Sequence, residues 1–470
     1  MKLHSYKNQN YKNQNVNGSV LLVSLGTALV LGILLAGYLI YTHTQNMSVA
    51  RSQTWNTAIV VSEAGVEEAL SHLNRNAPYF DPTEGTNNLA SNGWTSLGNG
   101  QYACPRRYLG QNYYDVTITL LAQTPVIDSA GSVYAPSPYV CAPQAMFAAA
   151  GVPPGPSYEA RQVRINTKID ALFAVAMAAV YQIDFKGNNV TTDAFDSADP
   201  NYSNNGLYPS GQLNKTKANG DVATDGNVVN TLSVGNADIK GKVKTGPNGT
   251  IAIGPNGSVG DRPWVEGGNH GIKPGWSAND MNVVFPPVTL PATTWLPKSK
   301  DNQRINGISY DYVFRTSGDY SISDGGNIYV TNNVNVRLRV TSSFSMNGNE
   351  DQIRIAPVNA SLKIYMEGSS FKIAGQGVVN ESGNAANFYY FGLPSNTELK
   401  FNGNAAFTGA VYAPNTDFTL GGGGNDTYDF IGASVSKTVK MNGKFNFHYD
   451  ENLAKVGGHR GFIPTRWKEP

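Results

Sequence analysis

A long uncharged hydrophobic run lies near the start of the chain. Residues 20–41 read VLLVSLGTALVLGILLAGYLIY and carry no charged side chain. As a helix they would extend about 33 Å, enough to cross a bilayer. Lys2, Lys7 and Lys12 precede the run, and Arg51 is the first charged residue after it. Because positive charge stays on the cytoplasmic side, we expect a single-pass protein with a cytoplasmic N-terminus, which contacts membrane lipid through residues 20–41 and places the rest outside.

A cleaved secretory signal is the alternative interpretation of this run. Such a signal has a hydrophobic stretch of about 7 to 15 residues and ends in a cleavage site of the small-x-small type. Residues 20–41 form a longer stretch without a clear site of that kind. The membrane anchor is therefore favoured. The polar tract before it repeats Tyr-Lys-Asn-Gln-Asn at Tyr6 and Tyr11, a composition typical of a disordered leader.

Beyond the run, the hydrophobic pattern takes on a helical period. Residues 46–74 contain no proline and one glycine, Gly65. Their apolar side chains recur at the spacing of one helical face: Val49, Ile59, Val60, Val66, Leu70 and Leu73. We therefore expect the anchor helix to continue outside the membrane until Pro78 ends it. Three carboxylates of this segment are interpreted as a solvated helix face rather than a metal or acid site: Glu63, Glu67 and Glu68.

An alternating pattern marks strands in the middle of the chain. Residues 114–120 and 163–169 alternate apolar and polar side chains, as half-buried strands do. The prolines between them predict an insertion. Residues 171–183 are mostly apolar and fit either a short buried helix or a strand. We expect a small α+β or β middle domain here.

A repeat defines the C-terminal half. Five segments share the order apolar, polar, apolar, small, Gly, and they begin at Phe344, Phe371, Leu399, Phe418 and Val439. Two further segments, FTGA and FIGA, begin at Phe407 and Phe430. Intervals of 27, 28, 19 and 21 residues with glycine corners favour a parallel β-solenoid, in which each coil covers the apolar face of the next. The alternative is a β-sandwich whose hairpins resemble one another by chance.

These patterns divide a mainly β chain of 470 residues into five segments. We expect a cytoplasmic leader over residues 1–18, and the transmembrane helix with its extension over residues 19–76. The middle domain follows over residues 77–183 and the β-repeat domain over residues 184–455. Residues 456–470 remain as a C-terminal tail.

Composition narrows the classes of function. Lys and Arg number 35 against 34 Asp and Glu, so no global field gathers nucleic acid, and we expect no nucleic-acid partner. The two cysteines, Cys104 and Cys141, are too few for a tetrahedral zinc site. They can form one disulfide if the domain lies outside the cytoplasm, and two unpaired thiols are the alternative.

Candidate catalytic residues are few. His448, Asp450 and Glu451 form the densest cluster of ionisable groups, and an enzyme would use His448 as a base oriented by one of the carboxylates. Because neighbours on a strand point to opposite faces, we interpret the cluster as a polar cap on the final coil. No GxxxxGK[ST], HExxH or GxSxG motif is present. We therefore expect no enzymatic activity, no cofactor and no metal.

Two other groups of residues have a structural interpretation that we favour. Asp193, Asp196 and Asp199 suggest a calcium loop, but their spacing differs from that of an EF-hand, and Asx turns are favoured. Aromatic residues of the repeat domain either stack along the core or bind sugars from an exposed face, and stacking is favoured: Tyr389, Tyr390, Phe391, Tyr412, Tyr428 and Tyr449.

The N-terminal segment resembles a known family. Gly18-Ser19 before the hydrophobic run, with ARSQTWNTAIVVSEAGVEEALSHLN after it, resembles the N-terminal segment of type IV pilin-like and pilus-assembly proteins over residues 15–76. The resemblance implies that a prepilin peptidase cleaves after Gly18 and leaves Ser19 as the mature N-terminus. Major pilins usually carry Glu at the fifth mature position, where this chain has Val23. Accessory members of such systems also vary there.

The repeat region resembles an uncharacterised domain that follows pilin-like anchors in some bacterial envelope proteins. The resemblance rests on GNADIKGKVKTGPNG, FTGAVYAPNTDFTLGG and FNFHYDENL, and it spans residues 180–455. Together the two resemblances imply a non-enzymatic, membrane-anchored pilin-like accessory protein, structural or adhesive in the bacterial cell envelope or in a type IV pilus-like assembly. The implied partners are other pilin-like subunits or envelope polymers, and the implied location is the cytoplasmic membrane or a surface filament. The alternative is a β-helix carbohydrate-active enzyme or a glycan-binding module of the envelope.

Overall fold

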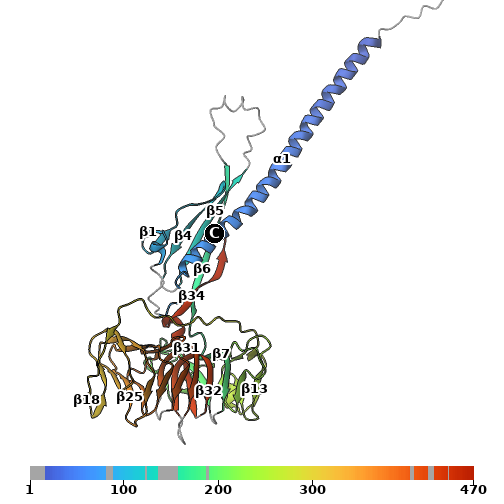
Figure 1. The fold of residues 1–470 in the computed structure, drawn as a ribbon. Coiled ribbons are helices and arrows are strands. Elements are labelled where there is room, and N and C mark those ends of the chain that lie inside the picture. Colours follow the sequence, from blue (N-terminus) through green and yellow to red (C-terminus); the bar gives the residue numbers. More distant parts are fainter. Residues whose placement is uncertain are drawn as a thin grey trace, which may run out of the picture.

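The computed structural model describes residues 16–80, 88–121, 124–135, 157–186, 190–402, 407–421, 428–442 and 444–470. Figure 1 shows a long helix, a small sheet that packs against one end of this helix, and a broad stack of short strands beyond the sheet. The described chain is thus mainly β with a helical N-terminal segment, as the sequence predicts.

Helix α1 (Val16–Leu73) is 58 residues long. It contains a stretch that is long and apolar enough to cross a membrane, judged by length and composition. Its side chains are exposed throughout residues 20–41, whereas Ala58, Ala69 and Leu73 nearer its end are fully buried. The long apolar helix and its extension are confirmed.

An antiparallel sheet covers the C-terminal half of α1, and we call these two elements together the head. The strand order is β1-β2-β4-β5-β6-β34, with β3 paired to β4. The strands are β1 (Thr95–Gly98), β2 (Gln101–Ala103), β3 (Arg107–Leu109), β4 (Asn112–Thr119), β5 (Val126–Ala135), β6 (Ser157–Ala171) and β34 (His459–Lys468), and the short helix α2 (Asn88–Ser91) precedes β1. Alternate residues of β4 and β6, such as Val116 and Ile165, are buried against α1.

The C-terminal segment is a strand of the head. Residues 456–470, expected to be a tail, begin at the last residue of the short helix α5 (Leu453–Val456) and contain β34, which pairs antiparallel with β6 between His459 and Lys468. Residues 171–183, which fitted either a helix or a strand, form a turn followed by β7 (Met177–Phe185). The C-terminal half of α1, the strands that follow it and the strand β34 therefore build the head, and the described residues between β6 and β34 are inserted into it.

Parallel strands form the inserted region, which we call the solenoid. Its first run comprises β7, β8 (Thr191–Phe195), β9 (Val222–Thr224), β10 (Leu232–Gly235), β11 (Asp238–Lys240), β12 (Val243–Lys244), β13 (Ile251–Ile253), β14 (Ser258–Gly260), β15 (Gly271–Ile272) and β16 (Ser277–Ala278), with η1 (Leu213–Lys215) and α4 (Arg262–Glu266) between them.

The second run begins at β17 (Leu296–Pro297), and an antiparallel hairpin of β18 (Gln303–Ile305) and β19 (Ile308–Tyr310) follows it. The other strands are β20 (Tyr312–Phe314), β21 (Gly318–Ile322), β22 (Ile328–Val330), β23 (Asn335–Val340), β24 (Phe344–Met346), β25 (Gln352–Ile355), β26 (Ser361–Met366), β27 (Ser370–Ile373), β28 (Gly377–Asn380), β29 (Phe388–Gly392), β30 (Glu398–Phe401), β31 (Phe407–Leu420), β32 (Tyr428–Met441) and β33 (Phe445–Asp450), with η2 (Ala385–Asn387) before β29.

The repeat predicted from the sequence sets the register of the stack, because equivalent positions of the repeat pair between adjacent coils. The first residues of its five segments pair in succession along parallel strands: Phe344, Phe371, Leu399, Phe418 and Val439. Phe407 pairs with Phe430 in the same way. The rings of Phe344 and Phe371 stack with centroids 4.6 Å apart. Parallel pairing in this register confirms the solenoid-like fold and rules out a β-sandwich of hairpins.

The order of the coils in space differs from their order in the chain. Val439 of β32 pairs with Ile183 of β7, and His448 of β33 pairs with Asp193 of β8. The first run therefore stacks onto the last coil of the second run. Residues 279–295, which we call the crossover, lie between the two runs in the sequence and contain no strand. Both connections to the head consequently leave from the middle of the stack.

Candidate functional site

Helix α1 offers two surfaces of different character. Its N-terminal part exposes large apolar side chains on all sides, including Leu22, Val23 and Ile40, each more than 60% exposed. Because exposing an apolar surface of this size to water is unfavourable in free energy, we expect an apolar environment to cover it. Gly18 and Ser19 lie near the start of α1. Cleavage between them remains a prediction.

The C-terminal part of α1 touches the sheet at close range. Ser129 of β5 donates a hydrogen bond to the Ser62 carbonyl at 2.8 Å, and the Gly131 amide donates to the Ser62 hydroxyl at 2.9 Å. A Cβ on Gly131 would collide with the backbones of Ala58 and Ser62, and a Cβ on Gly65 would collide with β4 and β5. Two glycines, one in each element, allow this approach.

A charged contact supports the same interface. Glu68 of α1 pairs with Arg107 at 2.8 Å and accepts a hydrogen bond from the Tyr114 hydroxyl at 2.9 Å. Burial opposes the charge of Glu68, but the hydrogen bonds from Arg107 and Tyr114 outweigh it and lower its pKa. Glu63 and Glu67 are exposed, as a solvated face requires. Glu68 instead joins the helix to the sheet.

The predicted disulfide is not tested by the structure, because only one of its two cysteines is among the described residues. Cys104 is buried in the head beside the α1 interface, and burial raises the pKa of its thiol. Cys141 lies outside the described residues. The bridge between Cys104 and Cys141 therefore stays a prediction.

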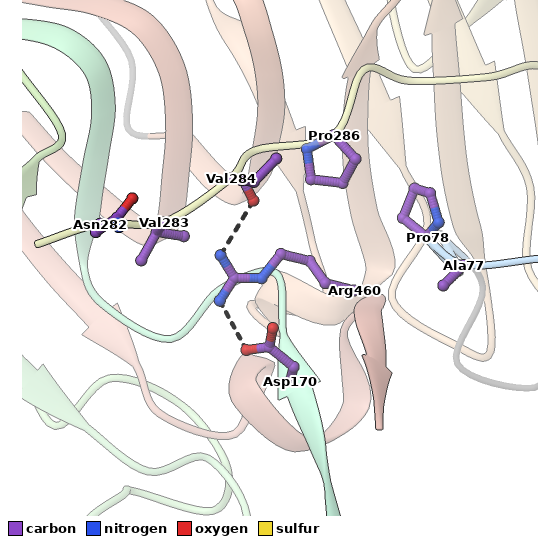
Figure 2. A pocket seen from close by; sticks show the side chains of 8 residues that line it. All are labelled: Ala77, Pro78, Asp170, Asn282, Val283, Val284, Pro286 and Arg460. Atoms are coloured by element: carbon purple, nitrogen blue, oxygen red, sulfur yellow. Dashed lines mark hydrogen bonds and ion pairs between the residues drawn. The ribbon is translucent and has the colours of Figure 1, made fainter. Parts of the chain in front are cut away.

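Arg460 occupies the junction between head and solenoid. Figure 2 shows its side chain crossing a pocket of about 450 Å³ that Ala77 and Pro78 also line. One guanidinium nitrogen donates to the Asp170 carboxylate at 2.7 Å, and another donates to the Val284 carbonyl of the crossover at 3.3 Å. The first residues of β34 and the end of β6 are thus tied to the crossover.

The aromatic residues of the second run are mostly covered. Five of the six named from the sequence are no more than 5% exposed: Tyr389, Tyr390, Phe391, Tyr412 and Tyr449. Phe80 packs against Phe391 and Tyr412, with centroids 5.5 and 5.7 Å apart. The Tyr412 hydroxyl donates to the Pro286 carbonyl of the crossover at 2.9 Å. Ring contacts confirm the stacking interpretation for the first four of these residues, Tyr449 is buried in the core, and Tyr412 offers no open face to a sugar.

His448 lies in a buried polar cluster. Its Nδ1 is 2.6 Å from a carboxylate oxygen of Asp193, and its Nε2 is 3.5 Å from Asp429. The ring of Tyr208 stacks on the imidazole with centroids 3.6 Å apart, and its hydroxyl donates to Asp193 at 2.9 Å. Burial disfavours the imidazolium, but hydrogen bonds and charge from both carboxylates outweigh this and raise the pKa of His448.

The expected partners of His448 lie elsewhere. Asp450 accepts hydrogen bonds from the backbone amides of Ser197 and Asn452, and Glu451 pairs with Lys217. The interpretation of this cluster as a cap on the final coil is also wrong. Strand β33 lies between β32 and β8, so it is an interior coil. The sequence could not reveal this, because β8 lies more than 250 residues earlier than β33 in the chain.

The Asp-rich segment closes turns. Asp196 accepts a hydrogen bond from the amide of Ala198 at 3.0 Å, and Asp199 accepts one from Asn201 at 2.9 Å. Both are Asx turns, which confirms the favoured interpretation. Asp193 faces His448 instead. Within the described ranges, no three His, Cys, Asp or Glu side chains converge on a point where a metal ion would fit.

Several of these contacts had no signal in the sequence. Gly131 and Ser62 are ordinary residues of a strand and a helix, and Arg460 lies 290 residues from Asp170. Only Gly65 stood out, as the single glycine of its helical segment. Asp193 and His448 were each singled out for a different role, and their pairing follows from the stacking of β33 on β8.

Comparisons with known proteins match the second run of the solenoid to a protein family, but they indicate no activity. Residues 301–456 match the model of a domain of unknown function, DUF7305, which confirms an uncharacterised C-terminal domain over about a third of the chain. No curated protein matches the chain. The structure is similar to that of the competence-associated pilin ComZ from Thermus thermophilus, at 10% identity over 88% of this chain and 96% of that chain, with a TM-score of 0.25. At this TM-score the two chains do not superpose closely as whole molecules.

Proposed function

We propose that this protein is a non-enzymatic, membrane-anchored pilin-like accessory component that holds its solenoid outside the cytoplasmic membrane. The observation that carries the proposal is the division of α1. Residues 20–41 expose apolar side chains on every side, and the last turns of the same helix are buried in the head. One continuous helix thus joins an apolar anchor to a folded head whose apolar side chains are buried in its own core.

The order of parts fits display of the solenoid away from the membrane. Both connections of the solenoid return to the head, and they leave from the middle of the stack. Arg460 and the aromatic contacts of Phe80 fix the solenoid to the head at this point. A solenoid that is attached to the head in this way suits a structural or adhesive role.

The anchor has two possible environments. Lipid would cover residues 20–41 in the membrane, and the same residues of other pilin-like subunits would cover them in a filament. Val23 leaves the fifth position after Gly18 uncharged. Val23 is compatible with an accessory role, because an accessory subunit need not match the charges of a repeating filament core.

A non-enzymatic role is supported by the surroundings of His448. Its ring is covered by Tyr208, and its two nitrogens face Asp193 and Asp429. A general base must reach a substrate proton within hydrogen-bond distance. The best catalytic candidate of the sequence is therefore engaged in holding the coil and the loop of Tyr208 together.

Mass spectrometry of the mature N-terminus tests the proposal. The protein would be purified from native membranes and from sheared surface filaments. We expect a chain that starts at Ser19, and Gly18→Leu should block this cleavage. Gly26→Ala is the matched control, because a Cβ at Gly26 meets no other atom and should leave processing unchanged. A chain that keeps Met1 in every fraction would contradict pilin-like processing.

A further inference from the structure

Four tyrosines form a continuous row on the face of the head sheet that points away from α1. Tyr108 contacts Tyr113 with ring centroids 6.0 Å apart, and Tyr113 contacts Tyr158 at 5.2 Å. Tyr158 in turn contacts Tyr134 at 6.0 Å. The next residue of β4, Tyr114, is buried with α1, so Tyr113 points to the opposite face. We call these four residues the tyrosine row.

The row is accessible although its members touch one another. Three of them are well exposed: Tyr108 (68%), Tyr158 (38%) and Tyr134 (44%). Small side chains follow Tyr113 across the sheet, since Tyr113 pairs with Ser132 and Ser132 pairs with Ala160. The rings therefore lie over small side chains, and Ser132 beneath them is only 7% exposed. Exposed aromatic residues gathered in this way are typical of an interaction surface.

The charged side chains beside the row neutralise one another. Arg106 lies over the ring of Tyr113, 4.0 Å from its centroid, and donates two hydrogen bonds to Asp115 at 2.9 and 2.8 Å. Arg164 makes the same double contact with Asp128, at 2.7 and 3.1 Å. Each guanidinium group is matched by a carboxylate. Around Tyr113 the surface thus presents rings, hydroxyls and a matched ion pair, whereas Arg466 and Lys468 of β34 lie farther along the sheet, beside Asn166 and Arg164.

We propose that the tyrosine row binds a neutral polysaccharide. The apolar C–H faces of sugar rings pack on aromatic rings, while sugar hydroxyls find partners in tyrosine hydroxyls and in the Arg and Asp side chains. An acidic polymer needs unpaired cations, and Arg106, the cation that lies over the row, is already paired with Asp115. An open surface also suits an extended polymer better than a small molecule, which needs a concave pocket.

The inference rests on the proposed function only in placing the head outside the membrane. Binding is measured with purified full-length protein in lipid nanodiscs, by calorimetry against dextran, laminarin, galactomannan and cello-oligosaccharides, with alginate as the acidic counterpart. We expect saturable binding of at least one neutral polymer. Tyr108→Ala and Tyr158→Ala should each weaken it about five- to tenfold.

Matched variants separate ring packing from folding. Tyr108→Phe keeps the ring and should bind within about twofold of the parent. Tyr181→Ala removes a tyrosine that is 59% exposed on β7 of the solenoid, and it should leave binding unchanged. Because Tyr108 is the most exposed member of the row, its loss should leave the unfolding temperature within about 2 °C of the parent.

Three results would overturn the inference. The first is no binding of any neutral polymer, or binding of alginate alone. The second is equal binding by the parent, Tyr108→Ala and Tyr158→Ala. The third is a change of sedimentation in these variants without a change in glycan binding, which would make a second copy of the chain the occupant of the row. None of these results bears on cleavage after Gly18, so the two proposals fail separately.

Discussion

The head and the solenoid are each stabilised internally, but by different kinds of contact. In the head, one helix packs against an antiparallel sheet, with a close approach at Ser62, Gly65 and Gly131. In the solenoid, the same apolar position recurs in coil after coil, as Phe344, Phe371 and Leu399 do. The head is therefore stabilised by one core between a helix and a sheet, whereas the stabilising contacts of the solenoid are spread along a ladder of coils. The two parts should respond separately to substitutions.

The largest expected effect is in the ladder. Phe371 is fully buried, stacks on Phe344 and contacts Tyr390 with centroids 5.0 Å apart. Phe371→Ala should lower the free energy of unfolding by about 3–5 kcal/mol, because it removes a buried ring from a packed stack. Hydrogen exchange should quicken in β24, β27 and β30, whereas β4 and β5 of the head keep their protection.

Lys372→Ala is the control for this substitution. Lys372 is the next residue of β27 and lies on the outer face of the coil. Its loss should change stability by less than about 0.5 kcal/mol. If Phe371→Ala opened the head and the solenoid to the same extent, the two parts would form a single cooperative unit, and the comparison would be wrong.

The next effect concerns the helix contact. Gly131→Val should destabilise the head by about 2–3 kcal/mol, because the new side chain has no room against the backbones of Ala58 and Ser62. Hydrogen exchange should quicken in the last turns of α1, and the solenoid should stay protected. Ala130→Val places similar bulk on the other face of the same strand and should be nearly neutral. Unchanged protection of α1 in Gly131→Val would contradict the close contact.

The smallest effect is the pH dependence of the solenoid. The pKa of His448 is raised above its unfolded value of 6.5. Its stabilising contribution is therefore fully present below about pH 6.5 and is lost as the pH rises through the folded pKa. Denaturant unfolding at several pH values should show this fall in the solenoid and not in the head.

Two substitutions check the assignment to His448. His448→Gln should remove the pH dependence, since it keeps a polar side chain without the titrating ring. His270→Gln replaces an exposed histidine in the first run of the solenoid and should leave the dependence intact. Stability that rises between pH 6.5 and pH 8.5 in the parent would show that the pKa of His448 is shifted in the other direction.

The sequence was most informative where neighbours in the fold repeat along the chain. The five short segments that begin with Phe344 predicted both the solenoid and its register, because parallel coils place equivalent residues side by side. The uncharged run and the helical spacing after it predicted α1 for a similar local reason. Each of these patterns is complete within about 100 residues of sequence.

The remainder depended on pairings between distant segments. Residues 459–468 looked like part of a tail, since no local pattern reveals that β6 lies open to receive them. His448 was assigned to an end of the stack, because order along the chain was taken as order in space. Gly131 and Arg460 likewise owe their roles to elements that approach only in the folded head.

The central claim is that residues 20–41 of α1 span the membrane, and that the head and the solenoid both lie outside the cytoplasm. A cysteine at Tyr181, a side chain that is 59% exposed on β7, tests this directly. Bacterial spheroplasts that carry Tyr181→Cys would be treated with a membrane-impermeant maleimide, with the parent chain as the control for Cys104 and Cys141. We expect full labelling without permeabilisation. Labelling that requires permeabilisation would place the solenoid in the cytoplasm and contradict it.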